Sequence, residues 1–477
     1  MAFSLTRTQV RSRILIPKYY DPDLDLAAER AKERYDLPRL GELLLPGEAG
    51  SRLGDWIRRE FYGTGPIPYV RTSDLSHWRI RPDYKKGISE EVYERYKQRQ
   101  DVGPGDILMV AHGTYLVGNI AIVTEEDSKL VLQDHVFRLR ISPSADVDPY
   151  YLLAALSTAF VRRQIRARQF SADIIDKIGN RHLGVRVPIL RDRAKRESIA
   201  RSVRSIIEDQ SRARDEFRAI TGSDLRMTRE RAEARYGFPL SRNQVRRRIL
   251  IPKYYDPAVT QSIEELKAHD TTPWVTLQGL IDAGKLTITN GIEVGKMAYG
   301  TGNIPFIRTS DIVGHQVKLD VRHGISEQIY EEHKARAAVE AGDILVVRDG
   351  TYLVGSSAIV TQDDLPAIFC GGIQRLRSVD KAQLSPYWLL AVLNMPIVRR
   401  QLRARQFTRD VIDTLGDRIL EIQIPSPDTQ EAHELDRRTA AVVTLQQEVK
   451  RRLHSVIDSV EPEAPSVLKG RPSWSMR

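Results

Sequence analysis

The feature that most constrains this chain is an internal duplication. The segment RILIPKYYDP at Arg13–Pro22 recurs unchanged at Arg248–Pro257. The segment YGTGPIPYVRTSDL at Tyr62–Leu75 returns as YGTGNIPFIRTSDI at Tyr299–Ile312, and we call the interval from Tyr62 to Tyr299 the repeat offset. Because the repeat offset far exceeds the roughly 20–50 residues of solenoid repeats, we expect each copy to be a domain with its own core.

The repeat offset also relates three further pairs of segments. They are GDILMVAHGTYLVG at Gly105–Gly118 with GDILVVRDGTYLVG at Gly342–Gly355, VRRQIRARQF at Val161–Phe170 with VRRQLRARQF at Val398–Phe407, and Ile178-Gly179 with Leu415-Gly416. The RILIPKYYDP segments lie slightly closer together, so one two-residue insertion between them and the YGTG segments accounts for the whole alignment. The chain is therefore two copies of one unit joined head to tail.

The charge balance is basic, with 73 Lys and Arg against 63 Asp and Glu, a net charge of +10 and a pI of about 9.5. This balance suits a nucleic acid, because phosphates attract Lys and Arg over long range, although many basic proteins bind nothing acidic. The single Cys370 excludes a disulfide framework and a cysteine-based zinc site. The N-terminus lacks an apolar signal segment and no run approaches about 18 apolar residues, so we expect a cytoplasmic protein.

Each copy is expected to be a mixed α/β (α+β) domain followed by a long helix. A reversal is expected at His112-Gly113-Thr114, since Gly permits a sharp turn between two strands. The expected helices are Leu24–Tyr35 and Pro149–Gln169, and the expected strands are Ile67–Val70, Val102–Val110, Tyr115–Val123, Phe137–Ile141, Val185–Ile189 and, in the second copy, Ile422–Pro425.

Two long segments, Arg191–Ile220 and Thr429–Val460, carry apolar residues at heptad spacing. The first seam is Ile199, Val203, Ile206, Ala213, Phe217 and Ile220, with Gln210 in the remaining position, and the second is Leu435, Val442, Leu445, Val449, Leu453 and Val456. We expect the two helices to pair with each other; the alternative is that each packs on its own domain. The predicted boundaries are 1–190 and 238–428 for the two domains, 191–237 and 429–460 for the helical regions, and 461–477 for a flexible tail.

Two glycine-rich segments resemble ligand-binding loops without fitting them. Phe61-Tyr62-Gly63-Thr64-Gly65 is similar to the loop of methyltransferases, but Pro66-Ile67-Pro68 follows where a helix should begin, which favours a structural turn. Gly291–Lys296 suggests a phosphate loop, but Met297 stands in place of the Ser or Thr that would hold magnesium.

An autonomous metal-dependent nuclease is an alternative from a different class, because such enzymes need two acidic groups and a Lys around a divalent ion. Pro82-Asp83 supplies half of this pattern and Glu332-His333-Lys334 the other half, but each half occurs in a different copy. The ten His residues show neither H-E-x-x-H nor H-x-H spacing. We therefore expect no metal site and no catalytic residue in this chain.

The repeated polar residues are instead suited to binding. Arg71-Thr72-Ser73-Asp74 and Arg308-Thr309-Ser310-Asp311 each combine a cation, two hydroxyls and a carboxylate at the end of a strand. Arg grips phosphate or guanine with two hydrogen bonds, and hydroxyls donate to phosphate oxygens. The alternative for the Asp is an internal Arg–Asp pair that braces the loop.

The two Gly-Thr-Tyr turns keep a frame and vary its tip, since Ala111-His112 precedes the first and Arg348-Asp349 precedes the second. That combination is typical of two domains that read different short sequences. Four arginines on one helix of each copy also suit phosphate, although they cover more than half its circumference, so about two should reach DNA. They are Arg162, Arg163, Arg166 and Arg168, and Arg399, Arg400, Arg403 and Arg405.

The motif order, repeated twice, resembles the specificity (S) subunit of type I restriction–modification systems. The motifs are G-x-I-P-x-(V/I)-R-T-S-D, G-D-I-L followed by G-T-Y-L-V-G, and a closing I-P strand before a long helix, and the resemblance covers about residues 4–460. One departure is the close likeness of the two copies, each with its RILIPKYYDP segment. That departure leaves a related modification or phage-defence system as an alternative.

The resemblance implies a non-catalytic subunit with two target recognition domains, each reading half of a bipartite site in double-stranded DNA. The long helices would pair as an antiparallel coiled coil, acting as a spacer and as the dock for two adenine methyltransferase (M) subunits, with restriction (R) subunits joining them. This chain would hold no cofactor, since S-adenosylmethionine, ATP and Mg would belong to the partner subunits. The implied DNA-reading loops are Arg71–Lys86, Ala111–Tyr115, Gln133–His135, Arg308–His323, Arg348–Tyr352 and Cys370–Gln374.

The candidate DNA contacts comprise loop residues and helix arginines. They are Arg71, Thr72, Lys85, Lys86, His112, Thr114, Tyr115, His135, Arg166 and Arg168 in the first copy, and Arg308, Thr309, Arg348, Asp349, Thr351, Tyr352, Gln374, Arg403 and Arg405 in the second. The length of the first long helix limits the gap between the half-sites. A continuous helix over Arg191–Ile220 would be about 45 Å long. At about 3.4 Å per base pair, the half-sites would lie at most about a dozen base pairs apart. A third alternative, a scaffold for acidic protein partners, would lack the steep salt dependence of phosphate binding.

Overall fold

The computed structural model describes residues 14, 16–81, 84, 86–113, 116–172, 175–222, 238–242, 245, 249–269, 273–318, 323–350, 353–409 and 412–462. The chain divides into two compact units. Unit 1 comprises Met1–Glu208 with Val449–Arg477, and unit 2 comprises Asp209–Glu448. The division differs from the predicted boundaries because each long helix contributes residues to both units. Within these described ranges, no helix is both long and apolar enough to cross a membrane.

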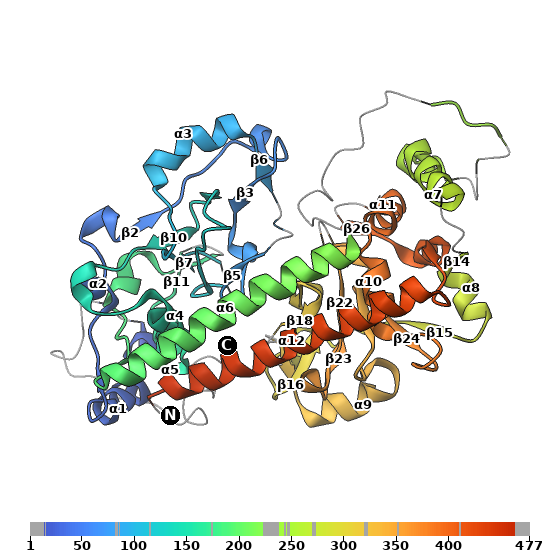
Figure 1. Cartoon of the computed structure of the whole chain (residues 1–477). Helices are drawn as coiled ribbons and strands as arrows, with labels where there is room; N and C mark the ends of the chain where they lie inside the picture. The colour runs from blue at the N-terminus through green and yellow to red at the C-terminus, as the bar shows by residue number, and fades with distance from the viewer. Residues whose placement is uncertain are drawn as a thin grey trace. The chain divides into compact units, whose positions relative to one another are not determined.

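Unit 1 holds a four-stranded sheet in the order β2-β10-β7-β8, a three-stranded sheet β6-β3-β9, and the two-stranded sheets β4-β5, β1-β13 and β11-β12 (Figure 1). Its strands are β1 Tyr35–Asp36, β2 Ser51–Leu53, β3 Ile67–Val70, β4 Leu75–Ser76, β5 Arg79–Ile80, β6 Gly87–Ile88, β7 Ile107–Val110, β8 Ile120–Ile122, β9 Val131–Leu132, β10 Val136–Leu139, β11 Phe170–Ala172, β12 Ile175–Lys177 and β13 Ile189–Leu190. Its helices are α1 Pro22–Ala31, α2 Leu40–Leu43, α3 Glu90–Gln100, α4 Pro149–Ser157, α5 Ala159–Ala167 and the first part of α6 Arg193–Thr221.

Unit 2 holds a six-stranded sheet in the order β15-β24-β20-β22-β18-β17, the three-stranded sheets β19-β16-β23 and β21-β26-β25, and the pair β14-β27. Its strands are β14 Trp274–Thr276, β15 Leu286–Asn290, β16 Ile304–Ile307, β17 Ile312–Val313, β18 Gln316–Val317, β19 Gly324–Ile325, β20 Ile344–Val347, β21 Asp349–Gly350, β22 Ser357–Ile359, β23 Ile368–Phe369, β24 Ile373–Ser378, β25 Phe407–Arg409, β26 Ile412–Thr414 and β27 Gln423–Pro425. Its helices are α7 Pro257–His269, α8 Leu277–Asp282, α9 Glu327–Ala337, α10 Pro386–Leu393, α11 Pro396–Ala404 and most of α12 Gln430–Val460.

The elements of the two units follow the sequence duplication, because the repeat offset separates β3 from β16, β7 from β20, α5 from α11, and β12 from β26. The predicted single helix over Pro149–Gln169 is wrong. It is two helices, α4 and α5, because Thr158 leaves the helical conformation and its hydroxyl accepts a hydrogen bond from Val161 N at the start of α5. The predicted helix Leu24–Tyr35 is likewise shorter, since Tyr35 belongs to β1.

Several strands are also shorter than predicted. Residues 102–106 do not belong to a strand, and Gly105 adopts a left-handed conformation with φ of 87° just before β7. Likewise β8 begins only at Ile120, after a turn in which Gly118 has φ of 87°. In both places a glycine turn lies within the segment that was predicted to be one strand.

The YGTG segments are structural turns, as predicted. Thr64 Oγ1 donates to Phe61 O (2.8 Å) and accepts from Ser89 N (3.0 Å), and Thr301 makes the equivalent bonds in unit 2. A side chain at Gly65 would begin 2.5 Å from the carbonyl oxygen of Ile88. This glycine is therefore required by the close approach of two backbone segments.

The RILIPKYYDP segment of the first copy is fixed to its own domain by a buried ion pair. Arg163 on α5 donates through Nε and Nη2 to the two carboxylate oxygens of Asp21, at 2.5 and 2.9 Å, and also to Asp23 at 2.7 Å. The side chains of Arg163 and Asp21 are only 6% and 1% exposed. In the second copy the equivalent Arg400 is exposed.

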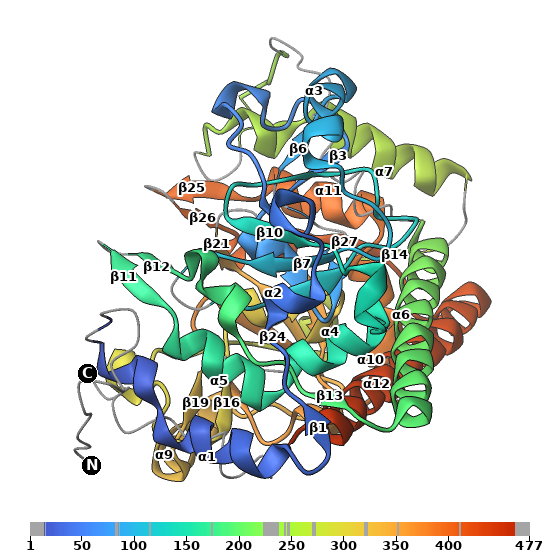
Figure 2. The same ribbon diagram turned by 90° about the vertical axis from the view of Figure 1, so that its left-hand side faces the viewer.

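Within each unit, the segments of the long helices α6 and α12 that belong to it lie side by side and run in opposite directions (Figures 1 and 2). In unit 1, Arg452 of α12 donates to Ser205 Oγ of α6 at 2.9 Å. In unit 2, Arg438 of α12 forms an ion pair with Glu216 of α6 at 2.7 Å. Among the predicted seam residues, Val203, Ile206, Phe217, Val442, Val449 and Leu453 are buried, whereas Ile199 and Leu435 are half-buried.

The helices also pack on the domains, so the two predicted alternatives occur together. In unit 2, Ala213, Phe217 and Val442 join one apolar cluster with Trp388 and Leu389 of α10. In unit 1, Glu461 follows the last residue of α12. Its carboxylate accepts hydrogen bonds from Ala159 N (2.5 Å) and Phe160 N (3.0 Å) at the start of α5. This carboxylate satisfies backbone donors and suits the positive end of the helix dipole.

One buried polar pair distinguishes the two otherwise similar domains. In unit 1, Ser51 Oγ lies 2.8 Å from Nε2 of His182, whose Nδ1 lies 2.7 Å from Gly179 O. His182 is fully buried, and burial lowers its pKa below the ordinary value. The repeat offset relates Ser51 to Ile288 and His182 to Ile419, so unit 2 has apolar side chains in place of this pair.

Unit 1 is expected to lose stability on acidification in a way that the double variant Ser51→Ile/His182→Ile does not. A histidine whose folded pKa is lowered contributes stability above its unfolded pKa of about 6.5 and loses it as the pH falls below that value, by up to about 1.4 kcal/mol per pH unit. Urea unfolding at about pH 7.5 and about pH 5.5 measures the difference for both proteins. An equal loss in the double variant would contradict the assignment to His182.

Candidate nucleic-acid interface

In unit 1 three of the predicted reading loops are joined by backbone hydrogen bonds. Gln133 N donates to Val70 O at 2.9 Å, which links the segment before β10 to the end of β3, where Arg71 follows. Ala111 N donates to His135 O at 2.8 Å, which links the loop after β7 to the same segment. Arg71, His112 and His135, which are distant in the sequence, are therefore carried by one connected group of loops.

Unit 2 repeats this frame bond for bond. Cys370 N donates to Ile307 O at 2.9 Å, and Arg348 N donates to Gly372 O at 2.8 Å. The repeat offset relates each donor and each acceptor to its counterpart in unit 1. The two domains thus share these backbone connections, whereas the side chains at their tips differ.

A fourth segment, which the sequence did not reveal, joins each group of loops. In unit 1 the hairpin β11-β12 pairs with the loop after β7. Gly113 N of that loop donates to Asp176 O (3.0 Å), and Ile178 N donates to Ala111 O (3.1 Å). In unit 2 the strands β21, β26 and β25 form one sheet, with Asp349 opposite Thr414. The repeated residues D-I-I-D-K-I-G and D-V-I-D-T-L-G are the sequence signal from which this hairpin could have been predicted.

An arginine braces each hairpin from its own domain. Arg181 donates to Arg168 O (2.9 Å) and Lys177 O (2.7 Å), and its guanidinium lies 4.2 Å from the centre of the Phe170 ring. Arg418 repeats these contacts in unit 2, with its guanidinium 3.8 Å from the Phe407 ring centre. Neither arginine was identified from the sequence, because its role depends on the fold around it.

The tyrosines of the RILIPKYYDP segments support the same hairpins. Tyr19 meets Phe170 edge to face with ring centres 6.0 Å apart, and Tyr254 meets Phe407 at 5.9 Å. Edge-to-face aromatic pairs of this kind contribute about 0.5–1.5 kcal/mol beyond their buried area. The repeated RILIPKYYDP segment therefore has a structural role, because its tyrosine packs against the hairpin.

The Asp of each R-T-S-D motif is a structural residue. Asp74 is fully buried and its Oδ2 accepts a hydrogen bond from the backbone N–H of Arg71 at 2.9 Å. Asp311 accepts from Arg308 N at the same distance. The bracing alternative for the Asp is therefore correct, although the donor is the backbone of the arginine.

The tip side chains of unit 1 are two histidines and an arginine. Arg71 Nε donates to Gln133 Oε1 at 3.3 Å, and the rings of His112 and His135 lie 4.7 Å apart. Burial lowers the pKa of His112, and the neighbouring His135 and Lys177 lower it further. His112 is consequently neutral near pH 7, and its ring can both donate and accept a hydrogen bond, as a base edge requires.

The tip side chains of unit 2 are two arginines, an aspartate and a histidine. Arg348 donates to Asp349 Oδ2 through Nε (2.8 Å) and Nη2 (2.6 Å). Arg308 is exposed, its Nη1 lies 3.4 Å from His323 Nε2, and its guanidinium lies 5.6 Å from the centre of the Tyr299 ring. The two domains thus present different hydrogen-bonding groups from one backbone frame.

An aromatic ring supports a cation beside each group of loops. The ammonium of Lys86 lies 5.6 Å from the centre of the Tyr62 ring. Tyr299 is the residue of unit 2 equivalent to Tyr62. Tyr62 is stacked on Tyr69, and Tyr299 on Phe306, so each ring is fixed from behind. These tyrosines belong to the YGTG turns and were not among the contacts predicted from the sequence.

The helix arginines differ in their exposure and in the bonds that they make. Arg168 donates to Gln164 O (3.2 Å) and Gly184 O (3.1 Å), and Arg405 has the equivalent bonds in unit 2. These two arginines therefore hold the end of their helix. Arg166 is exposed and Arg403 is half-buried, so they stay candidates for phosphate contact.

The remaining predicted contacts differ in what the structure shows. Gln374 is 2% exposed and donates to Asn290 Oδ1 at 3.1 Å within the sheet, so we do not retain it as a DNA contact. Thr72 and Thr309 are half-buried and begin the short helices Thr72–Asp74 and Thr309–Asp311. Lys85, Thr114, Tyr115, Thr351 and Tyr352 lie outside the described residues.

The residues considered for a nuclease site do not gather. Glu332, His333 and Lys334 lie on α9, where Lys334 forms an ion pair with Glu331 at 2.6 Å. Asp83 lies outside the described residues. In the part of the chain that the structure describes, no three His, Cys, Asp or Glu residues come together as metal ligands.

Comparisons with known proteins found similar solved structures only. No protein-family model matches the sequence, and no curated protein matches it. The chain is similar to the type I restriction–modification S subunit of M. genitalium (13% identity, 91% of this chain and 95% of that chain, TM-score 0.31). It is also similar to a chain from a type I restriction–modification complex (17%, 91% and 97%, TM-score 0.26) and to the HsdS subunit of Thermoanaerobacter tengcongensis (18%, 90% and 96%, TM-score 0.25).

Proposed function

We propose that this chain is the DNA-specificity subunit of a type I restriction–modification system or of a closely related defence system. The observation that carries the proposal is the pair of loop groups, which share one set of backbone hydrogen bonds but present different tip residues. In such an arrangement the frame sets where the DNA lies and the tips determine which bases are read. Two such frames in one chain suit a target made of two half-sites.

The chemistry of the tips supports base reading in the major groove. A neutral His112 can donate to or accept from a base edge, whereas Arg348 beside Asp349 offers a fixed donor fork, of the kind that pairs with guanine. Lys86 and Arg308, each beside a tyrosine ring, suit the phosphates that fix the register. The net charge of +10 agrees with a polyanionic partner.

The chain would act in a complex. Two methyltransferase subunits would supply adenine methylation with S-adenosylmethionine, and restriction subunits would supply ATP- and Mg-dependent cleavage. The paired helices α6 and α12 provide an extended surface on which such subunits could dock. The role of this chain is then to choose the site.

Affinity purification of the chain from its native cell, followed by selection of bound duplexes from a random pool, tests the proposal. We expect a methyltransferase to copurify and the selected duplexes to share two short sequences at a fixed gap. Affinity should fall steeply with salt, with a slope that counts the phosphate contacts. A single uninterrupted target, or magnesium-dependent cleavage by the chain alone, would contradict the proposal.

Replacing Arg308 by Ala is expected to weaken binding of the second half-site by about 1–3 kcal/mol, which is roughly 5- to 150-fold. The exposed Arg336 on α9 provides a matched control, because Arg336→Ala removes the same charge outside the loop group. Gel shift with duplexes that carry one randomised half-site measures both variants. Equal losses for the two would show that Arg308 contributes only net charge.

A further inference from the structure

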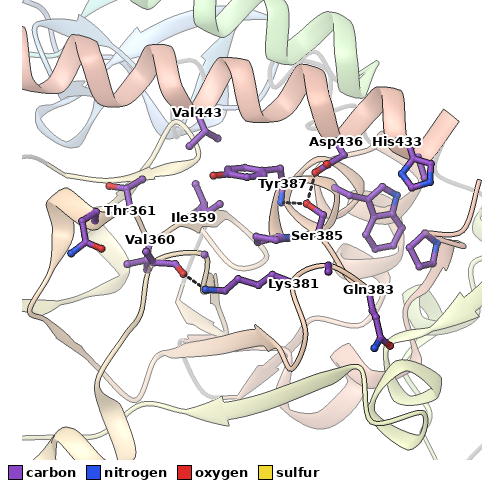
Figure 3. Close-up of a pocket in the computed structure, with 18 of the residues that line it drawn as sticks. Ile359, Val360, Thr361, Lys381, Gln383, Ser385, Tyr387, His433, Asp436 and Val443 are labelled. Atoms are coloured by element: carbon purple, nitrogen blue, oxygen red, sulfur yellow. Dashed lines mark hydrogen bonds between the residues drawn. The ribbon is translucent and has the colours of Figure 1, made fainter. Parts of the chain in front are cut away.

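Unit 2 contains a cavity of about 600 Å³ between α12, the start of α10 and the loops before it. Asp436 of α12 and Tyr387 of α10 both line it, and Lys381 lies farther from α12 (Figure 3). Ser385 Oγ donates to Asp436 Oδ1 and accepts from Tyr387 N at 3.2 Å, so one hydroxyl links the two residues. The cavity is thus lined by an aromatic residue and a carboxylate that share one hydrogen-bonding partner.

The equivalent place in unit 1 is identified by the duplication. The repeat offset separates the start of α6 at Arg193 from the start of α12 at Gln430, and it likewise separates the N-caps of α4 and α10, Asp148 and Ser385. Tyr150 of α4 therefore corresponds to Tyr387 of α10. The two sites can be compared residue by residue.

In unit 1 an arginine of the chain itself lies against the ring at this place. The guanidinium of Arg204 lies 4.2 Å from the centre of the Tyr150 ring and 3.6 Å from the carboxylate of Asp148. Arg196, nearer the start of the same helix, donates to Asp146 (3.0 Å) and to Leu190 O (2.8 Å). Two arginines of α6 thus bind the ring, the carboxylates and the backbone at this place in unit 1.

In unit 2 the arginines are replaced but their recognition groups are kept. The residue equivalent to Arg204 is Ala441, and the one equivalent to Arg196 is His433, which lines the cavity. The ring persists as Tyr387, and a carboxylate persists as Asp436, now supplied by α12. The second copy therefore retains a guanidinium site without a guanidinium of its own.

The other charged group that lines the cavity is Lys381, and it belongs to the opposite wall. Its ammonium donates to Ala341 O at 2.7 Å and so is held against the backbone. An arginine stacked on Tyr387 would gain a cation–π contact and an ion pair with Asp436, and the Lys381 ammonium would face the carbonyl groups of the same peptide. The cavity is large enough for an extended residue, not only for an ion.

From this comparison we infer that the cavity of unit 2 binds an arginine side chain presented by a partner protein. The guanidinium lies against the ring of Tyr387 and pairs with Asp436. The inference does not depend on the proposed DNA function, since neither residue belongs to the loop groups.

A blocked Gly-Arg-Gly peptide and its citrulline counterpart, a neutral isostere, test the inference with the full-length protein. Saturation-transfer NMR suits the weak binding of a short peptide. We expect the arginine peptide to bind roughly tenfold more tightly than the citrulline peptide, as a partly desolvated cation–π and ion-pair contact implies. Equal binding of the two peptides would overturn the inference.

Variants taken from the other copy locate the binding. Ala441→Arg places the guanidinium of unit 1 into unit 2 and is expected to reduce peptide binding at least tenfold, with no loss of thermal stability. Adding Arg204→Ala to it opens the equivalent place beside Tyr150, so peptide binding should return. If Ala441→Arg fails to fold, Tyr387→Leu should give the same loss of binding. Undiminished binding in either folded variant would overturn the inference.

Discussion

Replacing Arg163 by Ala is expected to lower the free energy of unfolding of unit 1 by about 3–5 kcal/mol, because it leaves the carboxylate of Asp21 buried without its partner. The Asp21 side chain is 1% exposed, so water cannot replace the two hydrogen bonds from the guanidinium. The variant also releases Asp23, which accepts from the same arginine at 2.7 Å. Urea unfolding followed by circular dichroism measures the change.

The second copy supplies the control. Arg400 occupies the equivalent position on α11 but is exposed, so Arg400→Ala should change stability by no more than about 0.5 kcal/mol. The double variant Asp21→Leu/Arg163→Met should recover much of the loss, since apolar pairs of similar volume replace buried ion pairs at little cost. Equal effects of Arg163→Ala and Arg400→Ala would show that the buried pair adds nothing.

Under the proposed function, insertion of one heptad into both long helices is expected to move the two half-sites of the DNA target apart by about three base pairs. Seven helical residues add about 10 Å, and a base pair rises about 3.4 Å. The insertions follow Asp209 in α6 and Glu448 in α12, so that the apolar seam continues on the same face. Affinity for the original spacing should fall roughly a hundredfold or more, since one half-site can no longer be reached.

Duplexes in which the gap varies one base pair at a time report this change directly. A heptad inserted into α6 alone serves as the control, because it shifts Glu216 away from Arg438 and should destabilise the helix pair instead of moving the gap. If the double insertion binds the original spacing unchanged, the long helices do not set the distance between the half-sites.

The sequence by itself determined the architecture of each domain in outline. The repeat offset identifies equivalent positions, and it holds for backbone hydrogen bonds as well as for residue types. The heptad spacing located both long helices to within two residues, because α6 is Arg193–Thr221 and α12 is Gln430–Val460. Such long periodic patterns depend on neighbouring residues in the sequence, so they can be recognised without knowledge of the fold.

Strand and helix limits were predicted less well, for physical reasons. The break between α4 and α5 depends on one threonine cap, and the start of β7 and β8 depends on glycine turns. These features set backbone direction without altering the apolar pattern. An analysis of apolar periodicity therefore does not detect these turns and caps.

Only the tertiary structure decided which repeated residues hold the fold and which stay candidates for binding. Asp74, Arg168 and Arg181 look like binding residues in the sequence or have no evident role, yet each is hydrogen-bonded within its own domain. Their partners come from segments that are distant in the sequence or from backbone atoms that no motif records. Likewise, the contact of Arg204 with the Tyr150 ring and the cavity of unit 2 depend on packed neighbours, so the sequence difference between Arg204 and Ala441 does not reveal them.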